Sequence, residues 1–351
     1  MMKVLHARVS SLLLIFVFGV SSVLLSEQVS ASSRISSYSN ENSTLVGLSE
    51  RTNFKLLHQL RGGIDLVAPN GAVSPNQDGM KYVAAQREAL WLIRNGIIHA
   101  SADLVSKGVL AFDYAFKFQT KDGYFENGMG ASPEAAVGAD AFFLYSFCYA
   151  YLLLEKESAY SQQFNKMKYY KKNVENSVAW IAKNQDELFR QDRHTPNRLL
   201  FDAMAFYFAG KILRSSEYQD LGKTFINHAL EAQRADGAFL EKGGHDSSYQ
   251  GVCILNLSML SFHVKGYLLK RDIAKAIKSS AAWMVSRINA DGEISAEGNT
   301  RTGLGQEEQS GKLKDINYPE VALSLYYAAS ILEKTEYADK ADAVVQYAIS
   351  R

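Results

Sequence analysis

The sequence predicts an all-α fold: an α/α toroid, open or closed, of about 10–11 helices paired into roughly five or six units. Three observations predict it. A turn phrase recurs, as Gln119–Glu126 (QTKDGYFE), Gln233–Glu241 (QRADGAFLE) and a weaker copy at Asn289–Ile294 (NADGEI). Long stretches carry apolar residues at helical spacing, and the chain has only five prolines. Helices that are apolar all round alternate with helices that carry a charged face, as in stacked helix pairs.

The N-terminus predicts export. Lys3 and Arg8 form a basic start, Leu12–Leu25 is an apolar stretch, and Val29-Ser-Ala31 is a small-x-small cleavage pattern. The apolar stretch is short for a membrane span and lacks a charged stop. We therefore expect a signal peptide that is cleaved near Ala31, a periplasmic or extracellular protein, and no stable membrane insertion after cleavage.

Three segments follow from this interpretation. Residues 1–31 are predicted to be the signal peptide, and residues 32–48, which are rich in Ser and Asn, a disordered leader. Residues 49–351 are predicted to form the toroid domain, which is long enough for one large core. The sequence leaves open whether this domain closes with five or six helix pairs.

Composition excludes some partners. The chain has 38 Lys and Arg against 37 Asp and Glu, so no overall charge favours nucleic acid. Cys148 and Cys253 lie in apolar stretches, where a disulfide and two buried free thiols are both possible. Neither belongs to a CxxC pair, so we predict no zinc bound by cysteine. We also predict no other metal and no cofactor, although acid-rich loops leave a calcium requirement open. We expect a monomer.

The apolar spacing and the turn residues place the helices. Pro133, Pro196 and Pro319 each stand where proline is favoured, in a first helical turn. In chain order, the predicted helices are Glu50–Arg61, Met80–Ile98, Ser101–Gln119, Pro133–Glu155, Ala159–Phe189, Pro196–Arg214, Glu217–Arg234, Ser247–Val264, Lys270–Asn289, Pro319–Glu333 and Tyr337–Ser350.

The alternation of helices and of loops predicts how the ring is built. Segments such as 142–149, 199–206 and 252–260 are apolar nearly all round and should be inner helices, whereas 164–172 and 271–278 should be outer. Short connections alternate with longer ones rich in Gly, Asp and Asn, and each long one precedes an inner helix. The N-termini of the inner helices should therefore gather at one end, where their free N–H groups favour anions.

One segment carries a resemblance to known proteins. Gln233–Gly251 (QRADGAFLEKGGHDSSYQG) resembles a D-G-x-F-x-E-x-G-G-x-D-x-x-Y pattern in α/α-toroid proteins of bacterial polysaccharide metabolism. Asp-Gly-x-Phe with a downstream Tyr resembles the toroid domains of chondroitin, hyaluronate and heparin lyases. The Gln-x-x-Asp-Gly-x-Phe element also occurs, as a structural turn, in terpenoid cyclase and prenyltransferase toroids. This resemblance implies a toroid fold and a glycan ligand.

The resemblance has limits. It covers Gln233–Gly251 well and the rest of the chain only by periodicity. The chain lacks the large C-terminal β-domains of the lyases, and it also lacks the Asp-rich signature that a terpene cyclase needs. The Asp236-Gly237 pair recurs in each copy, which favours a structural turn over a catalytic role.

The predicted catalytic residues are Glu241, His245, Asp246 and Tyr249. His245 occurs in one copy only, beside two glycines at a helix start, and could act as a general base or acid. A hydrogen-bonded loop histidine without chemistry is the alternative. Asp246 could equally be the N-cap of the following helix. Tyr249 could donate a proton or stack on a sugar ring, or simply pack in the core.

The predicted substrate-binding residues lie in three other loops. Two cations, an amide and a second histidine precede an inner helix and suit a carboxylate or sulfate. The first turn copy and the longest loop supply the others, and solvated polar loops are the alternative throughout. The set is Arg193, His194, Asn197, Arg198, Tyr124, Glu126, Arg301 and Tyr318.

Two chemistries fit these residue types. Uronate β-elimination needs a group that neutralises the carboxylate, a base and an acid, which Asn or Arg, His and Tyr can supply. Glycoside hydrolysis needs two carboxylates, such as Glu126 with Asp246 or Glu241 with Glu307. We therefore predict an exported lyase or hydrolase acting on an acidic, uronate-containing polysaccharide or oligosaccharide. A non-catalytic polysaccharide-binding or assembly factor and a helical-repeat scaffold are the alternatives.

Overall fold

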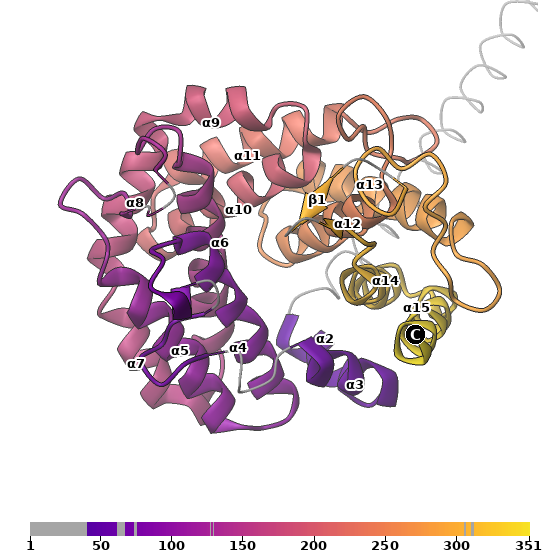
Figure 1. Ribbon diagram of the computed structural model, residues 1–351, viewed down its shortest axis with the longest axis horizontal. Helices are drawn as coiled ribbons and strands as arrows, with labels where there is room; N and C mark the ends of the chain where they lie inside the picture. The colour runs from indigo at the N-terminus through magenta and orange to yellow at the C-terminus, as the bar shows by residue number, and fades with distance from the viewer. Residues whose placement is uncertain are drawn as a thin grey trace, which may run out of the picture.

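The helices form a ring in a computed structural model of the chain (Figure 1). The structure describes residues 41–61, 67–73, 76–126, 128, 130–304, 307–309 and 312–351. The predicted signal peptide and residues 32–40 of the predicted leader lie outside these residues. The longer elements are α2 (Glu41–Ser49), α3 (Thr52–Arg61), α4 (Ala89–Ile98), α5 (Ala102–Phe116), α6 (Val137–Leu154), α7 (Ser161–Lys168), α8 (Lys171–Lys183), α9 (Gln185–Asp192), α10 (Pro196–Leu213), α11 (Ser216–Glu231), α12 (Ser247–Ser261), α13 (Tyr267–Ser286), α14 (Tyr318–Leu332) and α15 (Thr335–Ser350).

Short elements complete the described chain. Three are 3₁₀ turns and two form a small antiparallel hairpin in the loop between α13 and α14. They are η2 (Asn76–Asp78), η3 (Val83–Glu88), η4 (Ser158–Tyr160), β1 (Glu308–Gln309) and β2 (Lys312–Leu313).

The ring has an inner and an outer layer, as the alternation of helices predicts. Helices α4, α6, α10, α12 and α14 follow one another around the inside, and α5, α8, α11, α13 and α15 pack outside them. The inner helices are buried on nearly every side, whereas an outer helix such as α13 buries a single stripe. Helix α6 is long and apolar enough to span a membrane, but 83% of it is buried in this core.

Helices α2 and α3 occupy the remaining place in the ring, between α14 and α4. Arg51 pairs with Asp342 of α15 at 2.7 Å, and the Tyr327 hydroxyl of α14 donates to Glu41 at 3.1 Å. Leu45 is fully buried. The prediction of a disordered leader to residue 48 is therefore wrong from Glu41 onward, because this segment forms α2 and supplies core. In the part of the chain that the structure describes, α2–α3 is thus the sixth helix pair of the ring.

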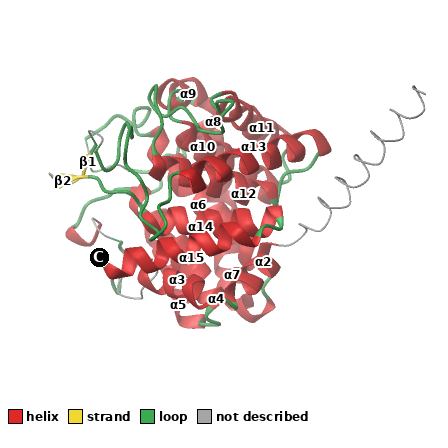
Figure 2. Ribbon diagram, turned by 90° about the vertical axis from the view of Figure 1, so that its right-hand side faces the viewer, coloured by secondary structure: helices red, strands yellow, loops and turns green. Residues whose placement is uncertain are grey.

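Most long connections lie at one end of the ring, where the β1–β2 hairpin also projects (Figure 2). They lead into α6, α12 and α14, and α10, which follows a connection of three residues, begins at the same end. The predicted orientation of the inner helices is confirmed, and the residues that begin them are brought close together.

Two predicted helices are divided in the structure. The segment predicted as one helix over 159–189 contains α7, all of α8 and the start of α9, with breaks at residues 169–170 and at Asn184. Asn184 ends α8 with φ −107° and ψ 22°, and its Nδ2 donates to the carbonyl of Trp180 at 2.9 Å. Residues 83–88 are 3₁₀ rather than α, and α6 begins at Val137, four residues after Pro133.

The recurring Asp-Gly turns are structural. Gly123, Gly237 and Gly292 all have φ between +94° and +97°, a region that favours glycine. Gln233 of the second copy donates to the Ser280 hydroxyl of α13 at 2.7 Å, as Gln119 does to Ser177 of α8. Each turn thus fastens the end of one outer helix to the next outer helix, which explains why the phrase recurs.

Replacing Gly237 by Ala is expected to lower the free energy of unfolding by about 2 kcal/mol or more, because positive φ and a backbone clash add. A Cβ there would lie 2.3 Å from the carbonyl oxygen of Ser279. Gly243→Ala is the matched control, since Gly243 has φ +88° but nothing within 4 Å of an added Cβ. Urea unfolding of both variants measures the difference, and equal losses would contradict the clash.

Both cysteines are free and fully buried, Cys148 in α6 and Cys253 in α12. Of the two alternatives, a disulfide and two buried free thiols, the structure has the free thiols. Burial raises the pKa of each thiol well above its ordinary value, so both remain protonated and act as small apolar side chains.

Candidate active site

A cavity of about 370 Å³ opens at the end of the ring where the inner helices begin; we call it the mouth cavity. The turn before α4, the first turns of α6, α10, α12 and α14, and the loop before α14 all contribute to its wall. Its lining residues are Tyr82, Arg87, Glu88, Phe142, Asn197, Arg198, Phe201, Ser248, Tyr249, Val252, Arg301, Glu307, Lys314, Asn317 and Glu320. The wall thus combines cations, carboxylates and aromatic rings.

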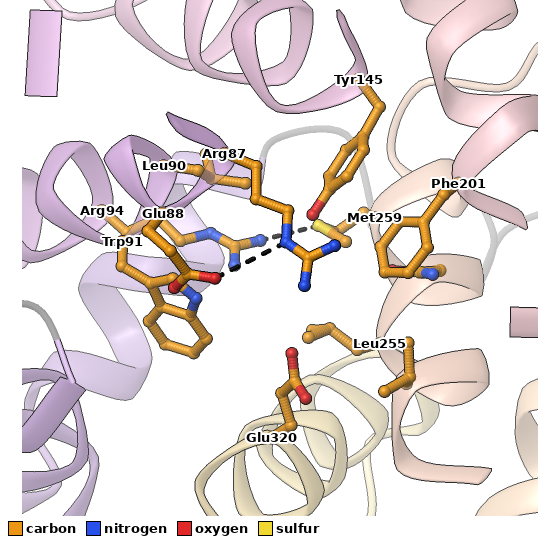
Figure 3. Close-up of a pocket in the computed structure, with 12 residues that line it drawn as sticks. Arg87, Glu88, Leu90, Trp91, Arg94, Tyr145, Phe201, Leu255, Met259 and Glu320 are labelled. Carbon is orange, nitrogen blue, oxygen red and sulfur yellow. Dashed lines mark hydrogen bonds and ion pairs between the residues drawn. The ribbon is translucent and has the colours of Figure 1, made fainter. Parts of the chain in front are cut away.

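A smaller cavity of about 30 Å³, the floor cavity, adjoins the mouth cavity and shares five lining residues with it (Figure 3). Arg94, Asn256 and Met259, which line it, are at most 3% exposed. The two cavities together therefore form a pocket that narrows toward the centre of the ring. The shared residues are Arg87, Glu88, Phe201, Val252 and Glu320.

Arg301 organises one wall of the mouth cavity. Its guanidinium bonds to Glu241 through Nη1 and to Glu307 through Nη2, the latter at 3.1 Å. It also lies 3.8 Å from the centroid of the Tyr249 ring. The Arg301 side chain is only 5% exposed. These contacts hold α12 and the long loop together and fix the positions of Tyr249 and Glu307.

Glu307 and Tyr249 form the polar centre of this wall. The Tyr249 hydroxyl donates to Glu307 at 2.7 Å, and the ammonium of Lys314 donates to the same hydroxyl. Partial burial favours a neutral Glu307, but the bond from Tyr249 and the charges of Arg301 and Lys314 outweigh it and lower the pKa of Glu307. Burial, together with the bond to Glu307, raises the pKa of Tyr249, so this hydroxyl keeps its proton.

Asp246 is the N-cap of α12. Its carboxylate accepts hydrogen bonds from the N–H groups of Ser248, Tyr249, Arg301 and Thr302 and from the Thr302 hydroxyl, at 2.7–3.2 Å. It is 1% exposed and does not line the mouth cavity. The N-cap alternative therefore accounts for Asp246, which also anchors the long loop to the start of α12.

His245 lies outside both cavities. Its Nε2 is 3.2 Å from the carbonyl oxygen of Glu297, and its ring packs against Trp283 of the outer helix α13 with centroids 5.3 Å apart. This arrangement is that of a hydrogen-bonded loop histidine. The structure does not bring His245 into either cavity, and it favours the alternative of a loop histidine without chemistry over the predicted catalytic role.

The loop before α10 divides into two parts. Arg193 and His194 are exposed and lie outside both cavities, and the carbonyl of His194 accepts from the N–H of Lys242 at 3.0 Å. Asn197 and Arg198 line the mouth cavity. Arg198 also pairs with the buried Asp192 at 3.1 Å. Half of this predicted anion-binding group thus reaches the mouth cavity.

The remaining predicted binding residues lie elsewhere. Glu126 pairs with Lys81 at 2.5 Å in solvent, and Tyr124 packs against Trp180. Tyr318 stacks on Tyr347 with centroids 5.4 Å apart, in a separate surface pocket. Arg301, by contrast, lines the mouth cavity, as Asn197 and Arg198 do.

A second group of residues, shared by the two cavities, was not predicted from the sequence. The carboxylates of Glu88 and Glu320 come from different helices and point into the same space, with the guanidinium of Arg87 beside them (Figure 3). Arg87 Nε is 3.6 Å from Glu88. Each carboxylate sits at a helix start, Glu88 as the N-cap residue of α4 and Glu320 in the first turn of α14.

Burial raises the pKa of Glu241 to about 7, although the charge of Arg301 opposes the shift. The ordinary pKa of a glutamate is 4.5. Between pH 4.5 and pH 7, Glu241 therefore keeps its proton in the folded state but has released it in the unfolded state. The contribution of Glu241 to the free energy of unfolding is therefore fully present below pH 4.5, and it falls by about 3 kcal/mol as the pH rises to 7. Glu241→Gln should flatten this part of a stability-against-pH curve, whereas exposed Glu336→Gln should not.

Among the described residues, no group of three or more His, Cys, Asp or Glu side chains could hold a metal ion.

One solved structure supports the architecture. The crystal structure of an unsaturated glucuronyl hydrolase specific for heparin superposes with a TM-score of 0.51 over 86% of this chain and 83% of that chain. The two sequences are 13% identical, so the likeness concerns the fold. The α/α toroid is the shared fold. No family model matches the sequence, and no curated protein matches it either.

Proposed function

We propose that this protein is a glycoside hydrolase that acts on an acidic, uronate-containing oligosaccharide or polysaccharide in the mouth cavity. The observation that carries the proposal is the pairing of Glu88 and Glu320, which face one space from different helices beside Arg87. Glycoside hydrolysis uses two carboxylic groups on either side of the bond, one as acid and one as base or nucleophile. The fold shared with a glucuronyl hydrolase supports the same class of reaction.

The rest of the wall suits an acidic sugar. Arg87, Arg198, Arg301 and Lys314 supply cations that can bind a carboxylate. Phe142, Phe201, Tyr82 and Tyr249 supply ring faces on which a sugar can pack. The volume of about 370 Å³ lies within the range of small-molecule sites.

The geometry favours hydrolysis over β-elimination. Elimination requires a base close to the sugar, and His245 lies outside both cavities. Tyr249 is a poor base because burial and its bond to Glu307 raise its pKa. Hydrolysis by Glu88 and Glu320, in contrast, requires no deprotonated tyrosine. We also propose that the protein is exported, on the basis of its N-terminal 31 residues.

The narrowing of the pocket predicts attack at chain ends. A polysaccharide cannot pass through a floor lined by buried residues, so only a terminal sugar can reach Glu88 and Glu320. We therefore expect release of single sugars rather than a ladder of fragments, and the products can be separated by chromatography.

An ultraviolet assay together with a reducing-end assay tests the reaction. The substrates are acidic oligosaccharides with and without a terminal unsaturated uronate, whose conjugated double bond absorbs. Hydrolysis of the unsaturated sugar should lower the absorbance while reducing ends increase. A rise in absorbance would show elimination and contradict the proposal. Binding without either signal would make the protein a glycan-binding factor.

A further inference from the structure

The floor cavity contains a buried cation that no carboxylate neutralises directly. Arg94 of α4 is 2% exposed, and its Nε has no hydrogen-bond partner. Its Nη2 contacts the sulfur of Met259 at 2.7 Å. Among the described residues, Arg94 forms no ion pair. A buried charge without a direct partner is costly, and an anion in the floor cavity would relieve that cost.

Aromatic rings surround the guanidinium on its other sides. The rings of Tyr149, Trp91 and Tyr327 have centroids 5.1–5.8 Å from the guanidinium carbon. The Tyr327 hydroxyl donates to Glu41 at 3.1 Å, so this carboxylate bonds to a ring beside Arg94 rather than to the guanidinium itself. These contacts hold the guanidinium in place and leave its side toward the floor cavity available.

The size of the floor cavity restricts what can bind there. A space of about 30 Å³ holds roughly two waters or one carboxylate group, but not a sugar ring. Its upper wall consists of the residues shared with the mouth cavity, among them Arg87, Glu88 and Glu320. An anionic group on a sugar that lies between Glu88 and Glu320 could therefore extend downward to Arg94.

We propose that the floor cavity is a carboxylate subsite in which Arg94, with Arg87 above it, binds the carboxylate of the acidic sugar held in the mouth cavity. This inference rests on the proposed function. It names the group that distinguishes an acidic sugar from a neutral one, and it places the glycosidic bond of that sugar beside Glu88 and Glu320. A neutral sugar would leave Arg94 unneutralised and should bind more weakly.

The melting temperature of the full mature chain provides a test that needs no turnover. D-Glucuronate, glucose and acetate are compared at equal ionic strength. Glucuronate should raise the melting temperature of the wild type more than glucose or acetate does. Arg94→Met should lose this rise and, without ligand, melt at or above the wild-type temperature, because an unpaired buried charge has been removed. Arg234→Met, at an exposed arginine outside both cavities, should behave as the wild type.

Either of two results would overturn the inference. Glucuronate could raise the melting temperature of Arg94→Met as much as that of the wild type, or acetate could raise the melting temperature of the wild type as much as glucuronate does. If Arg94→Met does not fold, Arg94→Lys keeps the charge but loses the planar fork, and its Kd for glucuronate should rise about 10- to 100-fold. An unchanged Kd would likewise refute the subsite.

The inference and the proposed function can fail separately. If glucuronate raises the melting temperature only when Arg94 is present, but no substrate is hydrolysed, the subsite is supported and the hydrolase proposal is wrong. If substrate is hydrolysed but the rise in melting temperature with glucuronate does not depend on Arg94, only the subsite proposal is wrong.

Discussion

Glu88→Gln and Glu320→Gln are each expected to lower kcat on the uronate-containing substrate by roughly 10²- to 10⁴-fold, the usual contribution of acid or base catalysis. Glutamine keeps the size of the side chain but can neither accept nor release a proton at neutral pH. Both carboxylates line the space shared by the two cavities, so substrate binding should change less than kcat. Reducing-end release under saturating substrate measures the effect.

A control variant and melting curves show whether a loss of activity is specific to these two carboxylates. Glu336→Gln removes a carboxylate paired with Lys334 at 2.9 Å in solvent, and it should retain full activity. Melting curves should show that Glu88→Gln and Glu320→Gln are folded. Full activity in either variant would remove that residue from the proposed pair, and full activity in both would end the hydrolase assignment for this cavity.

Arg301→Met is expected to lower the free energy of unfolding by about 3 kcal/mol at pH 8, because it leaves the buried carboxyl of Glu241 without its cation. The loss should be smaller at pH 5. Without Arg301, Glu241 takes up a proton on folding, and this costs more free energy as the pH rises. Denaturant unfolding at the two pH values measures both effects.

The double variant Arg301→Met, Glu241→Gln is the control for this explanation. It removes the carboxyl that would be left unpaired, so it should recover much of the stability lost at pH 8. If the double variant is no more stable than Arg301→Met, the loss comes instead from the packing of Arg301 on Tyr249, whose ring it covers at 3.8 Å.

The sequence predicted the features of the fold that depend on local pattern. The Asp-Gly phrase recurs because each copy needs a positive-φ glycine against the next outer helix, as at Gly237. The direction of the inner helices follows from the alternation of loop lengths. The place of α2 could not be predicted in the same way, because it depends partly on distant contacts such as the bond between Glu41 and Tyr327, which lie 286 positions apart.

The site was predicted where one segment carries several signals. Tyr249, Arg301, Asn197 and Arg198 were all expected and all line the mouth cavity. Local sequence could not show which way a loop side chain faces. His245 and Tyr249 are four residues apart, yet one packs on the outer helix and the other lines the mouth cavity.

The missed residues have weaker signals. Arg87 and Glu88 fall inside the predicted helix Met80–Ile98, and the 3₁₀ turn that contains them is not visible in the spacing of apolar residues. Glu320 lies in the first turn of α14, where an acidic residue is expected on helix-dipole grounds alone. Arg94 offered the better signal, as a single charge within the apolar stretch 89–98.

The contact between α3 and α15 also bears on how the chain folds. The pairing of Arg51 with Asp342 joins residues 291 positions apart, so it forms only after nearly the whole domain has been made and arranged. The loop-closure entropy of such a contact opposes early formation. An open arc of helix pairs is therefore the expected late folding intermediate, with an unsealed edge at each end that is exposed to association with other chains.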